Sequence, residues 1–113
     1  ALGGIVTKTV THQPSMGNKP YRTVELPGIG MLNSIGIQNP GLEACLTGEI
    51  PDLAQHRLPI ILSISAHSVD GFAAMAQMAA HSLSGPNIAA LELNLSCPNV
   101  SAGGIHFGTD CMA

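Results

Sequence analysis

Two nearly continuous apolar segments, residues 58–65 and 88–96, restrict the fold of this chain more than any other feature. Each is short and aliphatic, which predicts a buried β-strand of the kind found in parallel sheets. Between them, residues 69–82 predict a helix with Ser68 as its N-cap and with Phe72, Met75, Met78 and Ala79 on one side. A strand, a helix and a second buried strand together predict a βαβ unit.

The residues before this unit predict a further strand and a long connection. The β-branched run 4–11 predicts the first strand, and residues 12–40 are rich in Pro, Gly and Asn, with one arm of a hairpin expected at 21–26. Residues 41–55 predict a helix that Gly48 and Pro51 break. Residues 85–87 predict a turn, and residues 97–113 a loop. Long connections inside compact domains are often functional.

The expected fold class is α/β, and either a doubly wound sheet or part of a (β/α)8 TIM barrel would fit it. The first strand is not followed by a GxGxxG motif, which argues against a doubly wound nucleotide-binding domain. A composition of 45% hydrophobic and 10% charged residues is more apolar than a small domain needs, which suggests part of a larger protein. Because a whole barrel takes ~250 residues, we expect residues 1–113 to be a single segment of a partial TIM barrel. That segment would hold about three consecutive strands with their helices, and a long loop after the first.

Composition excludes several classes of function. The formal net charge is −3 and Lys and Arg number four together, so no nucleic-acid surface is expected. No apolar run reaches the ~18 residues of a membrane helix. Cys45, Cys97 and Cys111 form no CxxC pair, which favours a cytoplasmic setting. The histidines lack metal-ligand spacing, so no metal site is expected.

Polar residues at the carboxyl ends of the expected strands are the candidates for a site, because parallel α/β folds place their sites there. They are Lys8 and Thr9 in the first strand, Ser63 in the second, and Asn94, Ser96, Cys97 and Asn99 after the third. A lone Cys at a strand end is more often a small buried residue, but the flanking amides favour catalysis for Cys97. The structural alternatives are a solvated charge for Lys8, a turn residue at Asn33 and a tolerated small residue at Ser63.

Four segments, in this order, resemble class 1 dihydroorotate dehydrogenases. Residues 6–11, VTKTVT, resemble the second strand of that family, which contacts the flavin, and residues 31–41, MLNSIGIQNPG, resemble its orotate-binding loop. Residues 94–99, NLSCPN, resemble the catalytic strand end, and residues 103–110, GGIHFGTD, resemble the segment after the catalytic Cys in the NAD-linked subclass. Four matches in order over nearly the whole chain are far more specific than any one of them.

The resemblance implies a TIM barrel that binds FMN and oxidises dihydroorotate to orotate in pyrimidine biosynthesis. Cys97 would be the base that removes the C5 proton, while the hydride on C6 passes to the flavin. The substrate-binding residues would be Lys8, Asn33, Asn94, Asn99 and the backbone of Ile35, Gly36 and Ile37. The cofactor-binding residues would be Lys8, Thr9, Ser63 and Asn94.

The resemblance also implies partners, and it leaves alternatives open. The NAD-linked subclass works with a second subunit that carries FAD and a 2Fe-2S cluster, and a homo-oligomer is expected. The first barrel strand and the second half, which supply further flavin contacts in the family, are not in this sequence, so we expect the segment alone to bind FMN weakly. One alternative is a dihydropyrimidine dehydrogenase, which typically has His where Asn99 stands. Another is an inactive partial barrel that self-associates through its sheet edges.

Overall fold

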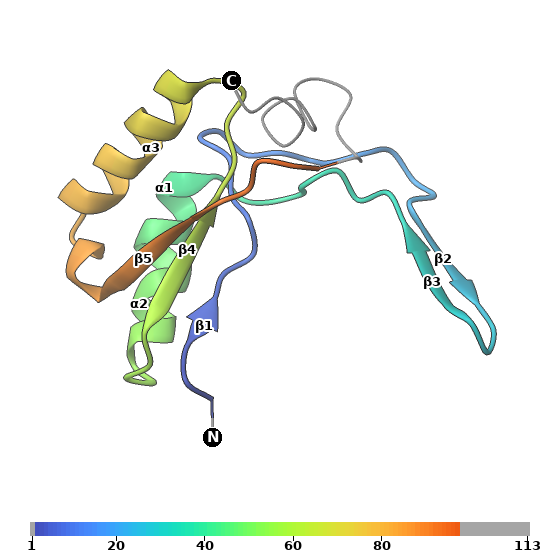
Figure 1. The fold of residues 1–113 in the computed structure, drawn as a ribbon, viewed down its shortest axis with the longest axis horizontal. Helices are drawn as coiled ribbons and strands as arrows, with labels where there is room; N and C mark the ends of the chain where they lie inside the picture. The colour runs from blue at the N-terminus through green and yellow to red at the C-terminus, as the bar shows by residue number, and fades with distance from the viewer. Residues whose placement is uncertain (1, 98–113) are drawn as a thin grey trace.

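A computed structural model of the chain describes residues 2–97 (Figure 1). The strands are β1 (Ile5–Val6), β2 (Thr23–Leu26), β3 (Gly30–Asn33), β4 (Ile60–Ile64) and β5 (Ile88–Leu93). The helices are α1 (Leu42–Ala44), α2 (Ile50–Ala54) and α3 (Val69–His81), with a π-helical turn at Cys45–Glu49 and a 3-10 turn at Gly85–Asn87. Strands β1, β4 and β5 form a parallel sheet in that order, and β2 and β3 form a separate antiparallel hairpin. The predicted α/β succession of parallel strands is confirmed.

Strand β4 is the centre of the sheet, since it pairs with both β1 and β5. It is apolar on the face that the helices cover. Ile60, Leu62 and Ile64 alternate onto that face and are completely buried. There they form one core with buried residues of α1, α2 and α3, so all the helices lie against the same face of the sheet (Figure 1). Ser63 lies between these residues in sequence, so its side chain takes the opposite face.

The helix predicted at 41–55 is continuous, and the expected break at Gly48 and Pro51 is wrong. It begins as α1, widens into the π-helical turn and resumes as α2. The widening is visible in one bond, since the Ile50 N–H donates to the carbonyl of Cys45, five residues back. Gly48 lies in the wide turn and Pro51 in the first turn of α2, where the missing N–H of a proline does least harm.

Helix α3 forms as predicted. Ser68 is its N-cap, and the Ser68 Oγ accepts a hydrogen bond from the Gly71 N–H at 3.0 Å. Phe72, Met75 and Ala79 recur at helical spacing and are buried against the sheet. The buried face of α3 therefore fixes the position of its N-terminus beside the end of β4.

The first strand is shorter than the predicted run 4–11. Regular pairing covers only Ile5–Val6, and a single bridge joins Val10 to Ile64 further on. Between these points the Thr7 Oγ1 accepts the Ser63 N–H at 3.1 Å. A side-chain oxygen thus takes the place of a backbone acceptor and interrupts the regular ladder.

The long excursion between β1 and α1 folds back on itself. It leaves the sheet at Thr11 and returns at Leu42, whose N–H donates to the Thr11 carbonyl at 2.9 Å. A bridge between Ser15 and Asn39 joins the two halves, and β2 with β3 continues the pairing away from the sheet (Figure 1). The hairpin arm predicted at 21–26 is confirmed as β2, whereas Asn33, expected in a loop, is the last residue of β3.

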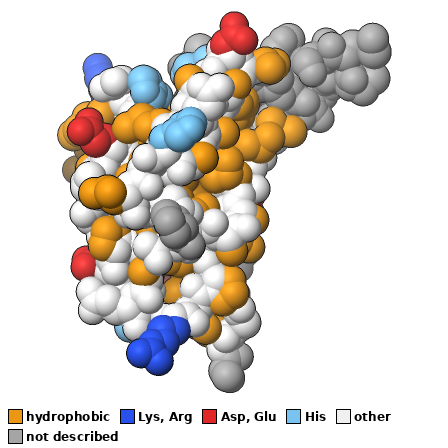
Figure 2. Space-filling model, turned by 90° about the vertical axis from the view of Figure 1, so that its left-hand side faces the viewer, with side chains coloured by type: hydrophobic (Ala, Val, Ile, Leu, Met, Phe, Trp, Pro, Cys, Tyr) orange, Lys and Arg blue, Asp and Glu red, His pale blue; other side chains and the backbone are white. Residues whose placement is uncertain are grey.

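Hydrophobic side chains are spread over the side of the molecule that carries α3, and charged side chains lie toward its margins (Figure 2). An apolar cleft of about 310 Å³ lies between α3, the 3-10 turn and β5. It is lined by Ala76, Ala79, Ala80, Gly85, Ile88, Ala90 and Leu91. Small side chains on α3 thus leave room beside β5 for another apolar element.

Candidate functional site

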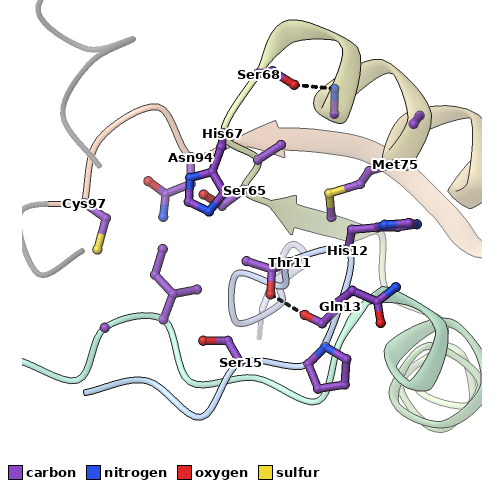
Figure 3. Close-up of a pocket in the computed structure, with 16 residues that line it drawn as sticks. Thr11, His12, Gln13, Ser15, Ser65, His67, Ser68, Met75, Asn94 and Cys97 are labelled. Atoms are coloured by element: carbon purple, nitrogen blue, oxygen red, sulfur yellow. Dashed lines mark hydrogen bonds between the residues drawn. The ribbon is translucent and has the colours of Figure 1, made fainter. Parts of the chain in front are cut away.

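A cavity of about 500 Å³ lies at the carboxyl ends of β4 and β5 (Figure 3). Parts of its wall come from the segment after the first strand, residues 11–15, and from the connection between β4 and α3, residues 65–68. The returning half of the excursion adds Gly36 and Ile37, and the chain after β5 adds Asn94 and Cys97. The cavity therefore occupies the edge of the sheet where parallel α/β proteins bind their ligands.

Four of the predicted site residues share this cavity. Gly36 and Ile37 face it from the excursion, and Asn94 and Cys97 lie more than fifty residues later in the sequence, after β5. Figure 3 shows Asn94 and Cys97 along one side of the space, with Ser15 on the other. The fold thus brings an amide, a thiol and a glycine-containing loop to one place.

The other predicted residues are placed elsewhere. Lys8 is exposed beyond β1, Asn33 is exposed at the end of β3, and Ile35 is half-buried, and these three do not line the cavity. Thr9 and Ser63 lie on the sheet beside it and are bonded to one another. Asn99 lies outside the described residues.

A chain of polar side chains joins the segment after β1 to β4 and β5, on the face opposite the helices. The Asn94 Nδ2 donates to the Thr9 Oγ1 at 3.2 Å, and the Thr9 Oγ1 is 2.9 Å from the Ser63 Oγ. The Ser63 Oγ donates to the Glu92 Oε1 at 2.7 Å. Glu92 was not among the residues predicted for the site, although it lies two residues before Asn94 in an apolar strand and so shares its face.

Asn39, also missed from the sequence, organises the loop at the cavity. Its side chain is only 7% exposed. The Oδ1 accepts the N–H groups of Thr11 at 3.1 Å and Gly41 at 2.8 Å, and the Nδ2 donates to the Ile37 carbonyl at 2.8 Å. Ile37 has φ 53°, a left-handed conformation that is unfavourable for a β-branched residue. The Asn-Pro-Gly sequence at 39–41 was the available signal, because Asn often bonds to backbone two residues away.

The two cysteines of the described region differ in environment. Cys45 is completely buried, and burial, followed by its hydrogen bond to Glu49 and the charge of that residue, raises its pKa to about 12. Cys97 is half-buried and lines the cavity. Only the thiolate reacts as a nucleophile, so Cys45 is chemically inert at neutral pH.

Iodoacetamide is therefore expected to alkylate Cys97 well before Cys45 in the folded chain. Peptide mass spectrometry of samples quenched over time gives the two rates separately. In denaturant, where burial is lost, the two rates should become similar. Equal rates in the folded chain would contradict the burial of Cys45.

Within residues 2–97, no group of His, Cys, Asp and Glu could hold a metal ion. Nor is any helix in the same range long and apolar enough to cross a membrane.

A parallel sheet with helices on one face and a cavity at its carboxyl edge defines the class of α/β proteins, which place their ligand sites at that edge. The family follows from comparison with known sequences. Residues 1–112 match the sequence profile described as dihydroorotate dehydrogenase. The chain belongs to the dihydroorotate dehydrogenase family, as its sequence motifs predicted.

Individual relatives show the same similarity. The catalytic subunit of dihydroorotate dehydrogenase B (NAD(+)) from Bacillus cytotoxicus is 50% identical over 109 residues, which cover 96% of this chain and 34% of that protein. The subunits of the same name from Desulforudis audaxviator and Bacillus mycoides are 50% and 49% identical, with the same coverage. The chain spans about a third of the length of these relatives.

Proposed function

We propose that this chain is the part of a dihydroorotate dehydrogenase catalytic subunit that carries the catalytic base and the substrate loop. The whole enzyme would oxidise dihydroorotate to orotate in pyrimidine biosynthesis. The observation that carries the proposal is the shared cavity, where Gly36 and Ile37 meet Asn94 and Cys97. Amide and backbone groups around one small space suit a planar ring acid with its own N–H and C=O groups.

The residues of the cavity have distinct roles in this proposal. Cys97 takes the C5 proton of dihydroorotate as general base. The Asn94 amide bonds the ring, since it offers both donors and acceptors. The backbone of Gly36 and Ile37 receives the carboxylate. The further substrate contacts are Lys8, Asn33, Ile35 and Asn99, as the family resemblance implies.

The polar groups on the face of the sheet opposite the helices suit the ring of FMN. Thr9, Ser63 and Asn94 form a row of hydroxyl and amide groups, and Lys8 adds an exposed cation next to Thr9. A cation beside the flavin ring favours its reduced anionic form. FMN, when bound, supplies the acceptor for the hydride of dihydroorotate. Phosphate contacts in TIM barrels usually come from loops after the seventh and eighth strands.

We infer that the complete fold is a TIM barrel. The strands β1, β4 and β5 are parallel and neighbour one another in sequence order, with the helices on one face. The polar row on the other face would then line the barrel interior. The apolar cleft between α3 and β5 is where the helix after β5 would pack.

We also infer a partner that carries electrons away. The relatives are named NAD(+)-linked catalytic subunits, which favours a separate subunit with FAD and a 2Fe-2S cluster. A homo-oligomer of the catalytic subunit, in the cytoplasm, completes the proposed assembly.

A chimera tests the proposed function. Residues 1–113 replace the aligned segment of the Bacillus cytotoxicus catalytic subunit, which is 50% identical there. Anaerobic dihydroorotate is expected to bleach the flavin absorbance of this chimera, as it should in the unmodified subunit, whereas dihydrouracil should not. A chimera that binds flavin but is not reduced by dihydroorotate would refute the proposal. Bleaching by dihydrouracil would indicate a dihydropyrimidine dehydrogenase instead.

A further inference from the structure

The hydrogen-bond chain from Glu92 to Asn94 has only one consistent direction. An ionised carboxylate has no proton to give, so the Ser63 hydroxyl donates to Glu92 at 2.7 Å. With its single proton used, the Ser63 Oγ accepts from Thr9 at 2.9 Å. The Thr9 proton is then used as well, so the Thr9 Oγ1 accepts from the group at 3.2 Å, which must be the NH2 of Asn94.

This direction, together with a bond from the Ser96 N–H, decides how the Asn94 amide is turned. The two ends of an amide have nearly the same shape, and only their hydrogen bonds distinguish them. The NH2 end lies on Thr9, and the Oδ1 accepts the Ser96 N–H at 3.3 Å. A flipped amide would place an oxygen against the Thr9 oxygen, with no proton between them.

We propose that Glu92 is a positioning residue, whose carboxylate orders the protons of Ser63 and Thr9 and so fixes the orientation of the Asn94 amide toward the ligand. The inference deepens the proposed function, because it explains how one amide offers a defined donor and acceptor to a ring that carries both. Ser63 and Glu92 lie in β4 and β5 and are direct partners in their register, while Thr9 and Asn94 lie just beyond the ends of β1 and β5.

The burial of the middle link supports this role. Ser63 is completely buried, so its hydroxyl finds its partners within the protein, and they are Thr9 and Glu92. Glu92 itself is exposed and Asn94 is half-buried at the cavity. The Glu92 carboxylate is thus connected through the hydroxyls of Ser63 and Thr9 to the Asn94 amide at the cavity.

Nuclear magnetic resonance of the full chain tests the order of the protons directly. Glu92→Gln keeps the shape but can donate as well as accept, so the direction of the chain is no longer fixed. The exchange of the Asn94 side-chain amide protons with water is expected to accelerate severalfold in Glu92→Gln and in Ser63→Ala. Glu25→Gln, which removes an exposed carboxylate from β2, is the matched control and should leave the rate unchanged. Equal rates in Glu92→Gln and in the control would overturn the proposal.

The chimeric enzyme gives a second, functional readout. Loss of one well-oriented hydrogen bond changes affinity by about tenfold, so Glu92→Gln should raise the KM for dihydroorotate and the calorimetric Kd for orotate by that factor, with a much smaller change in kcat. In an Asn94→Ala background the same substitution should have no further effect on orotate binding. Equal effects in both backgrounds would mean that Glu92 does not act through Asn94. A parent chimera that dihydroorotate does not reduce would refute the proposed function, while the amide exchange would still decide the role of Glu92.

Discussion

Replacing Cys97 with alanine in the chimeric enzyme is expected to slow flavin reduction by dihydroorotate by ~10²–10⁴-fold, the usual contribution of a general base. The side chain lines the cavity beside Asn94, and its removal takes away the one thiol that the described residues place there to accept the C5 proton. Stopped-flow absorbance under anaerobic conditions measures the chemical step in a single turnover. The Kd for orotate should change little, because the proposed ring and carboxylate contacts remain in place.

Controls separate loss of the base from loss of the fold. Cys45→Ala removes the completely buried thiol in the core, away from the cavity lining, and should reduce stability without slowing flavin reduction by more than a small factor. Cys97→Ser keeps a small polar group, but its hydroxyl is a much weaker base than the thiolate of Cys97. Its rate of flavin reduction should therefore stay close to that of Cys97→Ala. If the alanine variant reduced its flavin at a rate within tenfold of the parent, Cys97 would not be the base.

The elements that the sequence predicts best are those with strong local patterns. The apolar run that becomes β4 and the helix that follows Ser68 are each specified by residues close in sequence. The family itself follows from short motifs around Asn33 and Cys97, which need no three-dimensional information. Local patterns are therefore sufficient to predict an α/β fold with parallel strands.

The features that the sequence did not predict depend on contacts between distant residues. Strand β1 is cut short because Thr7 bonds to Ser63, and these residues are 56 positions apart. Gly48 is locally a helix breaker, but the π-helical turn absorbs it because the buried side chains of Cys45 and Leu46 hold the helix to the core. Local propensity cannot register either effect, since tertiary packing decides both.

The same limit applies to the site. Sequence motifs predict Asn94 and Cys97 as site residues, but they do not show which side chains support the surrounding cavity. Glu92 and Asn39 act through hydrogen bonds to groups on other segments. Their partners become visible only when the strands are aligned and the excursion has folded back. Residues in a recognisable motif are thus easier to predict than side chains that support a cavity through hydrogen bonds to distant segments.

Replacing Asn39 with alanine is expected to lower the free energy of unfolding of the chain by ~2–4 kcal/mol, because it leaves the buried Gly41 N–H and the partly buried Thr11 N–H without an acceptor, and such groups cost up to ~1–3 kcal/mol each. The substitution removes the acceptor of the Thr11 and Gly41 N–H groups and the donor to the Ile37 carbonyl. Urea unfolding followed by circular dichroism measures the change. Ile37 loses the hydrogen bond that helps to hold its left-handed conformation. Because its backbone is proposed to receive the carboxylate, orotate binding in the chimera should weaken as well.

Asn33→Ala is the matched control, because it removes the same side chain from an exposed position on the same excursion. Exposed substitutions change stability by about 0.5 kcal/mol or less, so Asn33→Ala should leave unfolding nearly unchanged and yet weaken orotate binding if Asn33 contacts the substrate. Asn39→Ala should affect both quantities, since the loop must be held before it can bind. If Asn39→Ala left stability unchanged, the buried amide would not support the loop, and the conformation of Ile37 would need another source. If Asn39→Ala were less stable but bound orotate normally, Asn39 would support the loop without being needed for the carboxylate site assigned to Gly36 and Ile37.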